Sequence, residues 1–264
     1  MPAVYTHDKF GKLVYKLLSK ENRQIIFTYL SQFRIGLQGP DFLFFYNPFH
    51  TNPIARLGHS IHERPAAQLL SPMMEVIGEK GKKSPEYAYI LGLICHFTLD
   101  SECHHYINAS ISQVGLGHIE LETEFERFMM QRDGLNPLGC KIWQLIPVDD
   151  NTANTLAALY PTIDAKTARS CLFQMYYTKK ILTAPKNLHY HILDSLFHLS
   201  GHYDSIQGHL MKPEPAADCN EFCSVLLQKF LKAVPIGAEL ITQFEDCLEN
   251  KKKLPERFQR DFIS

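Results

Sequence analysis

The sequence lacks a charge imbalance, a paired-cysteine pattern and a long hydrophobic run. Its 27 basic and 28 acidic side chains give a formal net charge of −1, so no excess of positive charge predicts a specific nucleic-acid partner. Its 7 cysteines are an odd number without CxxC spacing. They indicate reduced, mostly buried thiols rather than a disulfide framework.

The longest apolar run, residues 87–99, is too short to span a bilayer and contains His96. Residues 1–11 have neither the basic segment nor the apolar segment that precedes a secretory cleavage site. We therefore expect a cytoplasmic protein with no signal peptide and no transmembrane segment.

Apolar residues recur at three- and four-residue steps along most of the chain, which is the periodicity of helices packed on a core. Helices are predicted at 10–34, at 54–78 with interruptions near Pro65 and Pro72, and at 85–107, 118–131, 164–184, 187–209 and 219–249, with shorter ones at 139–146 and 150–160. No alternating runs bounded by hairpin turns, internal repeats or linkers occur. The sequence predicts one all-α domain over residues 1–264.

Histidines and acidic residues recur at four-residue steps in the middle of the chain. His96, Asp100 and His104 are spaced in this way, and His118 and Glu122 repeat the step. Residues four apart lie on one face of a helix, so each set can converge on one point. Imidazole and carboxylate groups are ligands that zinc accepts. The pattern predicts a metal centre, and two sites sharing a carboxylate would make it multinuclear.

A histidine and an acid four residues apart are more often a solvated pair or a satisfied polar pair in the core. Here His96 and Asp100 lie in an apolar stretch, where an unpaired acid would be costly to bury. A metal ion would neutralise the acid and satisfy the neighbouring imidazoles. His7 near the N-terminus, Asp41 after a Gly-Pro turn and His62 on a predicted helix are further potential ligands.

Five short motifs follow one another along the first half of the chain: THDKFG, QGPDFLFF, LGHSIHE, CHFTLDSECHHYI and HIELETEFERF. Together they resemble the zinc-dependent phospholipase C family, most closely its signal-less branch from Gram-positive bacteria. Single-strand nucleases of the S1/P1 type have the same ligand order and share the all-helical fold. The resemblance covers residues 1–135 by motif and the rest by helical character. It implies a multi-helix bundle of the phospholipase C and P1 nuclease type.

The resemblance also implies up to three zinc ions. One would be held by Asp41, His62, His96 and Asp100, and a second by His104, His118 and Glu122. The third would be held by His7, an oxygen of Asp100 and the N-terminus of the chain. Secreted members supply this last ligand from an N-terminal tryptophan, which is not found at this position here. Removal of Met1 would expose Pro2, and we predict that the Pro2 amine and carbonyl oxygen replace it.

Two ligand choices stay open. Secreted members place a histidine six residues after the bridging aspartate, whereas His104 and His105 follow Asp100 by four and five residues here. Helical stacking favours His104, because the side chain of His105 points about 100° away from that face. His59 competes with His62, and the family motif favours His62. We interpret His105 and His59 as surface histidines or as hydrogen-bond partners of ligands.

Four more histidines would share one face of the predicted helix 187–209: His191, His198, His202 and His209. No family motif accompanies them, so we interpret them as a polar face rather than as a second metal site.

The predicted function is hydrolysis of a phosphodiester by zinc-activated water. Asp41 is the candidate to orient that water or to accept its proton. The expected substrate is a phospholipid, reached by transient contact with a membrane surface. The aromatic run after Asp41 would line the entry or belong to the core. The alternatives are an S1/P1-like nuclease or other phosphodiesterase, and a non-catalytic helical protein that binds zinc.

Overall fold

The computed structural model describes residues 3–48, 50–183, 191–193, 195–196 and 207–263. The α-helices are α1 (Val4–Tyr15), α2 (Lys20–Thr28), α3 (Leu30–Gly36), α4 (Pro53–His62), α5 (Ala66–Lys80), α6 (Pro85–Val114), α7 (His118–Arg132), α8 (Asp150–Leu159), α9 (Ala165–Leu182) and α12 (Asn220–Glu249). The 3-10 helices are η1 (Gly39–Phe45), η2 (Pro137–Gly139), η3 (Ile142–Leu145), η4 (Gln207–His209) and η5 (Glu256–Gln259). No strand occurs in the described residues, and the all-α prediction is confirmed.

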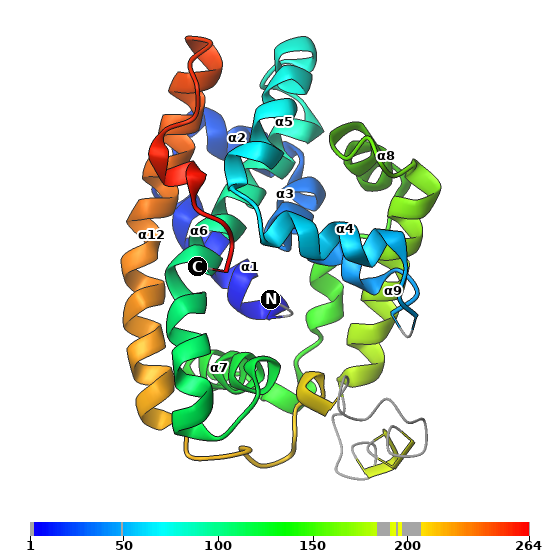
Figure 1. The fold of residues 1–264 in the computed structure, drawn as a ribbon, viewed down its shortest axis with the longest axis vertical. Helices are drawn as coiled ribbons and strands as arrows, with labels where there is room; N and C mark the ends of the chain where they lie inside the picture. The colour runs from blue at the N-terminus through cyan, green and yellow to red at the C-terminus, as the bar shows by residue number, and fades with distance from the viewer. Residues whose placement is uncertain (1–2, 49, 184–190, 194, 197–206, 264) are drawn as a thin grey trace.

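Two 30-residue helices, α6 and α12, run along the long axis of the molecule (Figure 1). The Ser84 hydroxyl caps the N-terminus of α6 by accepting a hydrogen bond from the Tyr87 N–H at 3.3 Å, and Pro85 occupies the first turn of the helix. Gly115 follows its last residue in the left-handed conformation, with a φ of +77°. Between these ends α6 is apolar and buried over most of its circumference, so it is the central helix of the fold.

Helix α3 crosses α6 at two glycines. A Cβ on Gly92 would lie 2.3 Å from the Phe33 carbonyl oxygen, and one on Gly36 would lie 2.2 Å from that of Tyr89. Only glycine permits this approach of the two backbones. Because η1 follows α3 closely, the tight crossing also brings Asp41 close to α6.

The predicted helix 10–34 is wrong in its extent, because three helices cover this region. Helix α1 begins earlier, at Val4, and ends at Tyr15. The Ser19 hydroxyl caps the N-terminus of α2 by accepting a hydrogen bond from the Asn22 N–H at 3.1 Å. The apolar spacing continues across these breaks, so periodicity alone did not show them. As a separate helix, α1 carries the buried side chain of His7 to α6.

Other helix boundaries also differ from the prediction. The segment 54–78 is divided into α4 and α5 at Pro65, as predicted, whereas Pro72 lies inside α5 and does not interrupt it. Helix α6 continues to Val114 rather than to 107, and the segment 139–146 is formed by η2 and η3. Most of the predicted helix 187–209 lies outside the described residues, and its last three residues form η4.

After α12 the chain returns to the middle of the molecule (Figure 1). The Arg260 carbonyl accepts a hydrogen bond from the Ala66 N–H at 3.0 Å, and the Phe262 N–H donates to the His62 carbonyl at 3.2 Å. The Phe262 ring is buried, with its centroid 5.3 Å from that of His62 and 5.8 Å from that of His96. The C-terminal segment therefore packs directly on the predicted ligands.

A single cluster of buried apolar side chains extends from Ala3 to Phe262 and joins α1, α6, α9 and α12. Among the described residues, no helix has both the length and the apolar character needed to cross a bilayer.

Candidate metal centre

Three buried side chains, His96, Asp100 and His104, lie on one face of α6 and are called the ladder below. Asp100 lies at the centre of this face. Its Oδ1 is 3.3 Å from His7 Nε2, and its Oδ2 is 3.2 Å from His96 Nε2 and 4.0 Å from His104 Nδ1. The two oxygens of this carboxylate thus face histidines from two different helices, α1 and α6.

Two further side chains reach His96 from η1 and α4. Gly39 has a φ of +52°, and a Cβ at this position would lie 2.2 Å from the His96 ring, so the glycine lets η1 pass close over the imidazole. Asp41 Oδ1 is 3.0 Å from His62 Nε2 and 4.0 Å from His96 Nε2. His96 therefore lies between Asp100 on one side and Asp41 on the other.

The other end of the ladder meets α7. His118 begins α7 and Glu122 lies one turn later on the same face. Glu122 Oε1 is 2.7 Å from His118 Nε2 and 3.3 Å from His104 Nε2. Three groups result in which the potential ligand atoms lie within 4.8 Å of one another: His7, His96 and Asp100; Asp41, His62 and His96; and His104, His118 and Glu122.

Four of the five histidines in these groups are oriented by a hydrogen bond from Nδ1–H. The acceptors are the carbonyl oxygens of Leu37 for His96 (3.2 Å), Gly58 for His62 (2.8 Å) and Phe262 for His104 (2.7 Å), and Asn108 Oδ1 for His118 (2.7 Å). Such contacts fix the tautomer and the direction of the ring, which leaves Nε2 as the nitrogen available to a metal ion.

The charges of the centre follow from burial and from close pairing. Burial alone would raise the pKa of Asp100, but His96 and His104 hold this pKa well below its usual range. Burial lowers the pKa of His96 to about 3. Asp100 is therefore ionised and His96 neutral at pH 7, the protonation states that metal ligands need.

His104 behaves differently. Burial opposes its charged form, but Asp100 and Glu122 raise its pKa to about 9. A proton therefore competes with a metal ion at His104 when no ion is bound.

The donor atoms fit a zinc ion. In the described part of the chain, His96 Nε2, both carboxylate oxygens of Asp100 and Glu122 Oε2 are buried without a hydrogen bond. Buried polar atoms without partners are costly and need an explanation. A cation between them would satisfy all of them together, and imidazole nitrogen with carboxylate oxygen is a donor set that zinc accepts.

The structure brings eight predicted ligands together: His7, Asp41, His62, His96, Asp100, His104, His118 and Glu122. Pro2 lies outside the described residues. For the two open choices, His105 and His59 are exposed, whereas His104 and His62 are buried and face carboxylates. Of the histidines on the predicted polar face, His191 is exposed, and His198 and His202 lie outside the described residues.

The aromatic run after Asp41 belongs mainly to the core. Phe42 and Phe45 are buried, whereas Phe44 and Tyr46 are half-buried. The Phe44 ring stacks on His62 with a centroid distance of 5.2 Å and contacts the exposed His59 at 4.7 Å. The interpretation of this run as core packing fits these contacts better than its interpretation as an entry.

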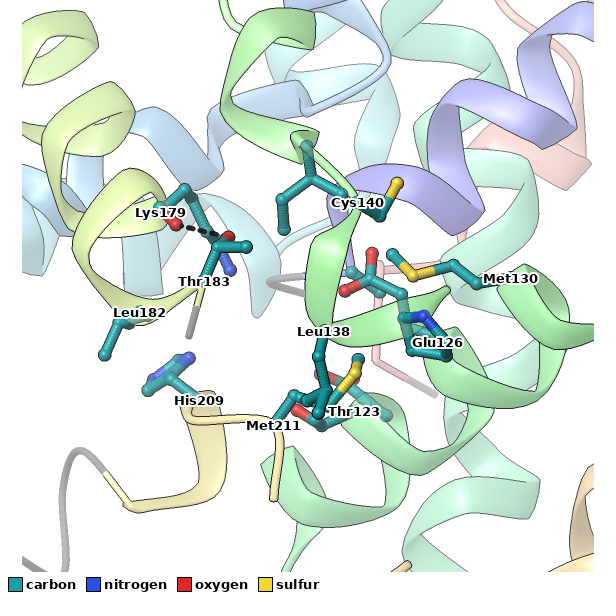
Figure 2. Close-up of a pocket in the computed structure, with 14 residues that line it drawn as sticks. Thr123, Glu126, Met130, Leu138, Cys140, Lys179, Leu182, Thr183, His209 and Met211 are labelled. Atoms are coloured by element: carbon teal, nitrogen blue, oxygen red, sulfur yellow. Dashed lines mark hydrogen bonds between the residues drawn. The ribbon is translucent and has the colours of Figure 1, made fainter. Parts of the chain in front are cut away.

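A pocket adjoins the ladder on the side of α7 (Figure 2). Its lining includes Glu126, Lys179 and His209, three side chains that can carry charge and that the sequence did not predict as part of the site. Glu126 continues the four-residue step of His118 and Glu122, and this signal could have found it. Nothing in the local sequence marks Lys179, and the spacing of His209 predicts a polar helix face instead.

The fold and the donor groups define a helical protein with a candidate zinc centre. A profile of the family described as zinc dependent phospholipase C matches residues 6–178, which contain all eight converging side chains. The match covers more than half of the chain, so this protein belongs to the zinc-dependent phospholipase C family, as the motifs predicted. Membership of this family supports zinc-dependent hydrolase activity. No curated protein and no solved structure matched the chain.

Proposed function

We propose that this protein hydrolyses a phosphodiester, and that its substrate is a phospholipid. The observation that carries the proposal is the position of Asp100, which faces His7 with one oxygen at 3.3 Å and His96 with the other at 3.2 Å. A carboxylate shared in this way can join neighbouring ions. Ions about 3.5–4 Å apart suit an in-line displacement at phosphorus.

The converging residues would hold up to three zinc ions. The sets are Asp41, His62, His96 and Asp100 for one ion, His104, His118 and Glu122 for a second, and His7, Asp100 and the Pro2 amine and carbonyl oxygen for a third. When bound, zinc supplies Lewis acidity toward a phosphoryl oxygen and makes water nucleophilic near neutral pH.

Asp41 would orient the attacking water or accept its proton. Its carboxylate is buried and lies 3.0 Å from His62 Nε2, which supports a fixed direction. The backbone acceptors of His62 and His96 hold the neighbouring rings in place. As the water oxygen bonds to phosphorus, the bond from phosphorus to the diacylglycerol oxygen breaks, and that oxygen takes up a proton.

A phospholipid is favoured over a single-stranded nucleic acid. Nucleases that act on single strands stack bases on accessible aromatic rings. Beside Asp41, the rings of Phe42 and Phe45 are packed in the core, and those of Phe44 and Tyr46 are half-buried, so no ring of this run is fully accessible to a base. The net charge of −1 also provides no general attraction to a polyanion.

The test is hydrolysis by zinc-loaded protein of phosphatidylcholine and phosphatidylethanolamine in mixed micelles, with single-stranded DNA and RNA in parallel. We expect diacylglycerol and a phosphorylated headgroup to be released by the wild type and not by Asp100→Asn. Asp150→Asn, at a carboxylate whose side chain is 73% exposed, is the matched control and should remain active. Cleavage of nucleic acid alone would contradict the lipid assignment. Zinc binding without hydrolysis of any phosphodiester would indicate a non-catalytic zinc protein.

A further inference from the structure

A groove of about 280 Å³ lies between α9 and the segment that follows η1. Pro48 borders it on one side, and Phe173, Tyr177 and Ile181 border it on the other. These three side chains of α9 are 49%, 43% and 54% exposed, respectively. Because they are spaced by four residues, they form one apolar stripe that faces solvent. The stripe and the groove beside it are called the α9 face below, and a cluster of this kind marks an interaction surface.

Basic side chains accompany the apolar stripe. The two segments that border the groove, residues 42–62 and 165–182, contain no aspartate or glutamate, although the whole chain has a formal net charge of −1. The exposed basic residues that share the side of the stripe on α9 are Lys166, Arg169 and Lys180. Arg169 pairs with Asp150, whereas Lys180 Nζ lies over the Tyr177 ring, 5.8 Å from its centroid. The α9 face therefore combines aromatic, aliphatic and basic side chains.

The α9 face is joined to the candidate metal centre by η1. Asp41 lies in the first turn of η1, and the segment beyond η1 passes beside α9 (Figure 1). The Asn47 N–H in this segment donates a hydrogen bond to Gln174 Oε1 on α9 at 3.0 Å. At the end of η1, the ring centroid of Phe45 lies 5.9 Å from Lys179 Nζ. A surface bound at the α9 face would therefore contact the segment that continues directly from the element of Asp41.

A lipid membrane fits the composition of this face. Side chains that bind at the membrane–water interface are apolar or aromatic where they enter the headgroup layer, and basic beside anionic headgroups. A second copy of the chain fits less well. Two copies that met at the same face would bring the same basic side chains together, and like charges oppose such a contact.

We propose that the α9 face docks the protein on a lipid membrane. Phe173, Tyr177 and Ile181 enter the headgroup layer, and Lys180 contacts anionic headgroups. The choice of a membrane rests on the proposed function, because a phospholipid substrate lies in a bilayer. The docking itself needs no substrate, so the face should also bind a membrane that contains no phosphodiester.

The first experiment measures co-sedimentation of zinc-loaded protein with vesicles of digalactosyldiacylglycerol, with and without the anionic sulfoquinovosyl diacylglycerol. Neither lipid has a phosphodiester, so the metal centre has no substrate in these vesicles. Phe173→Ser combined with Ile181→Ser should bind about 10-fold more weakly than the wild type, because two apolar side chains no longer enter the lipid. Lys180→Gln should bind anionic vesicles about 5-fold more weakly, and high salt should remove this difference. Equal binding by the wild type and the double variant, or no binding by the wild type, would overturn the proposal.

The matched control is Phe27→Ser on α2, because the Phe27 ring is 74% exposed and lies outside the α9 face. It should bind vesicles as the wild type does. Equal weakening in Phe27→Ser would show a general attraction of exposed apolar rings to lipid, and the α9 face would have no special role. Ile181→Trp is a second variant, and it should bind more tightly because indole rings favour the membrane interface. Unfolding does not explain tighter binding, and weaker binding of this variant at an unchanged Tm would contradict the proposal.

Sedimentation velocity in the absence of lipid tests the second copy as the occupant. We expect a monomer for both the wild type and the double variant. A wild-type dimer that Phe173→Ser with Ile181→Ser separates into monomers would assign the α9 face to a second copy of the chain, and membrane docking would be wrong.

Hydrolysis separates this proposal from the proposed function. With monomeric short-chain phosphatidylcholine, the double variant should keep the kcat/KM of the wild type. With vesicles of phosphatidylcholine and phosphatidylglycerol, its rate should fall by the factor found for vesicle binding. If the wild type cleaves no lipid but binds vesicles through the α9 face, the lipid assignment fails and the docking face stands. If the double variant binds and cleaves vesicles as well as an active wild type does, the proposed function stands and the docking face fails.

Discussion

The candidate metal centre has a closed part and an open part that use the same kinds of side chain. The closed part consists of His7, Asp41, His62, His96 and Asp100, each of which is at most 6% exposed. In the open part, His104 and Glu122 are buried, but the side chain of His118 is 33% exposed. The closed part takes its side chains from α1, η1, α4 and α6, whereas the open part uses α6 and α7 alone. The closed part therefore depends on the packing of four separate elements, while the open part is accessible to solvent at His118.

The largest effect is expected from Asp100→Asn, which breaks the closed part. The substitution removes the carboxylate that faces His7 and His96, while Asp41 stays 4.0 Å from His96 Nε2. We expect the loss of at least one zinc per chain and a free energy of unfolding about 3–4 kcal/mol lower at saturating zinc, because an ion that binds only the folded protein stabilises it by mass action. Elemental analysis and thermal unfolding measure the two effects. Unchanged zinc content would mean that the ladder is a feature of the core and not a metal site.

A smaller effect is expected from His118→Ala, which breaks only the open part. Because this side chain is partly exposed, its loss should change the free energy of unfolding by about 1 kcal/mol or less. One zinc should be lost while the ions of the closed part remain. Elemental analysis of this variant beside Asp100→Asn tests the difference. Loss of every ion in both variants would show that the two parts bind zinc as one unit.

Glu126→Gln weakens the closed part through α1. Ala3 precedes α1 without a side-chain cap, and Glu126 Oε1 instead accepts the Tyr5 N–H at 2.6 Å. An anion at this helix end is stabilising, so its neutralisation should cost about 1 kcal/mol. Zinc competition with a chromophoric chelator should show weaker binding at the His7 end alone. Glu239→Gln, at an exposed position on α12, is the control. Equal zinc affinity in both variants would show that Glu126 does not position α1.

The smallest effect is expected at the two competing histidines. His105 and His59 are exposed, and neither belongs to a group of converging donor atoms in the described structure. Replacement of either by alanine should change the free energy of unfolding by about 0.5 kcal/mol or less. Zinc content should stay at the wild-type value. If His105→Ala lost an ion, His105 rather than His104 would be the zinc ligand, and the open part would lie on the other face of α6.

The open part could be predicted from sequence more fully than the closed part. His104, His118 and Glu122 follow helical steps, and α7 begins and ends within one residue of the prediction. The fold class and the family were also predictable, because the helical periodicity and the order of motifs are properties of the sequence itself.

Contacts between distant segments could not be predicted. The spacing of apolar residues does not predict the break between α1 and α2, where Ser19 caps α2. The Phe262 carbonyl oxygen contacts His104, and Lys179 lines the pocket beside Glu122. Each of these pairs is separated by more than fifty residues in the sequence, and the spacing of neighbouring residues does not predict such contacts. Only the packing of α9 and of the C-terminal segment shows that these groups lie beside the ladder.

The C-terminal segment also determines when the centre can be completed. Phe262 accepts a hydrogen bond from His104 and donates one to the His62 carbonyl, so one residue holds two elements in place. During translation this residue is added well after Glu122, on the order of ten seconds later at about 5–20 residues per second. An ion captured in that interval would meet a His104 ring that is still free to turn. A ribosome stalled before Phe262 would therefore carry every side chain of the ladder, but the His104 ring would lack the carbonyl oxygen that orients it.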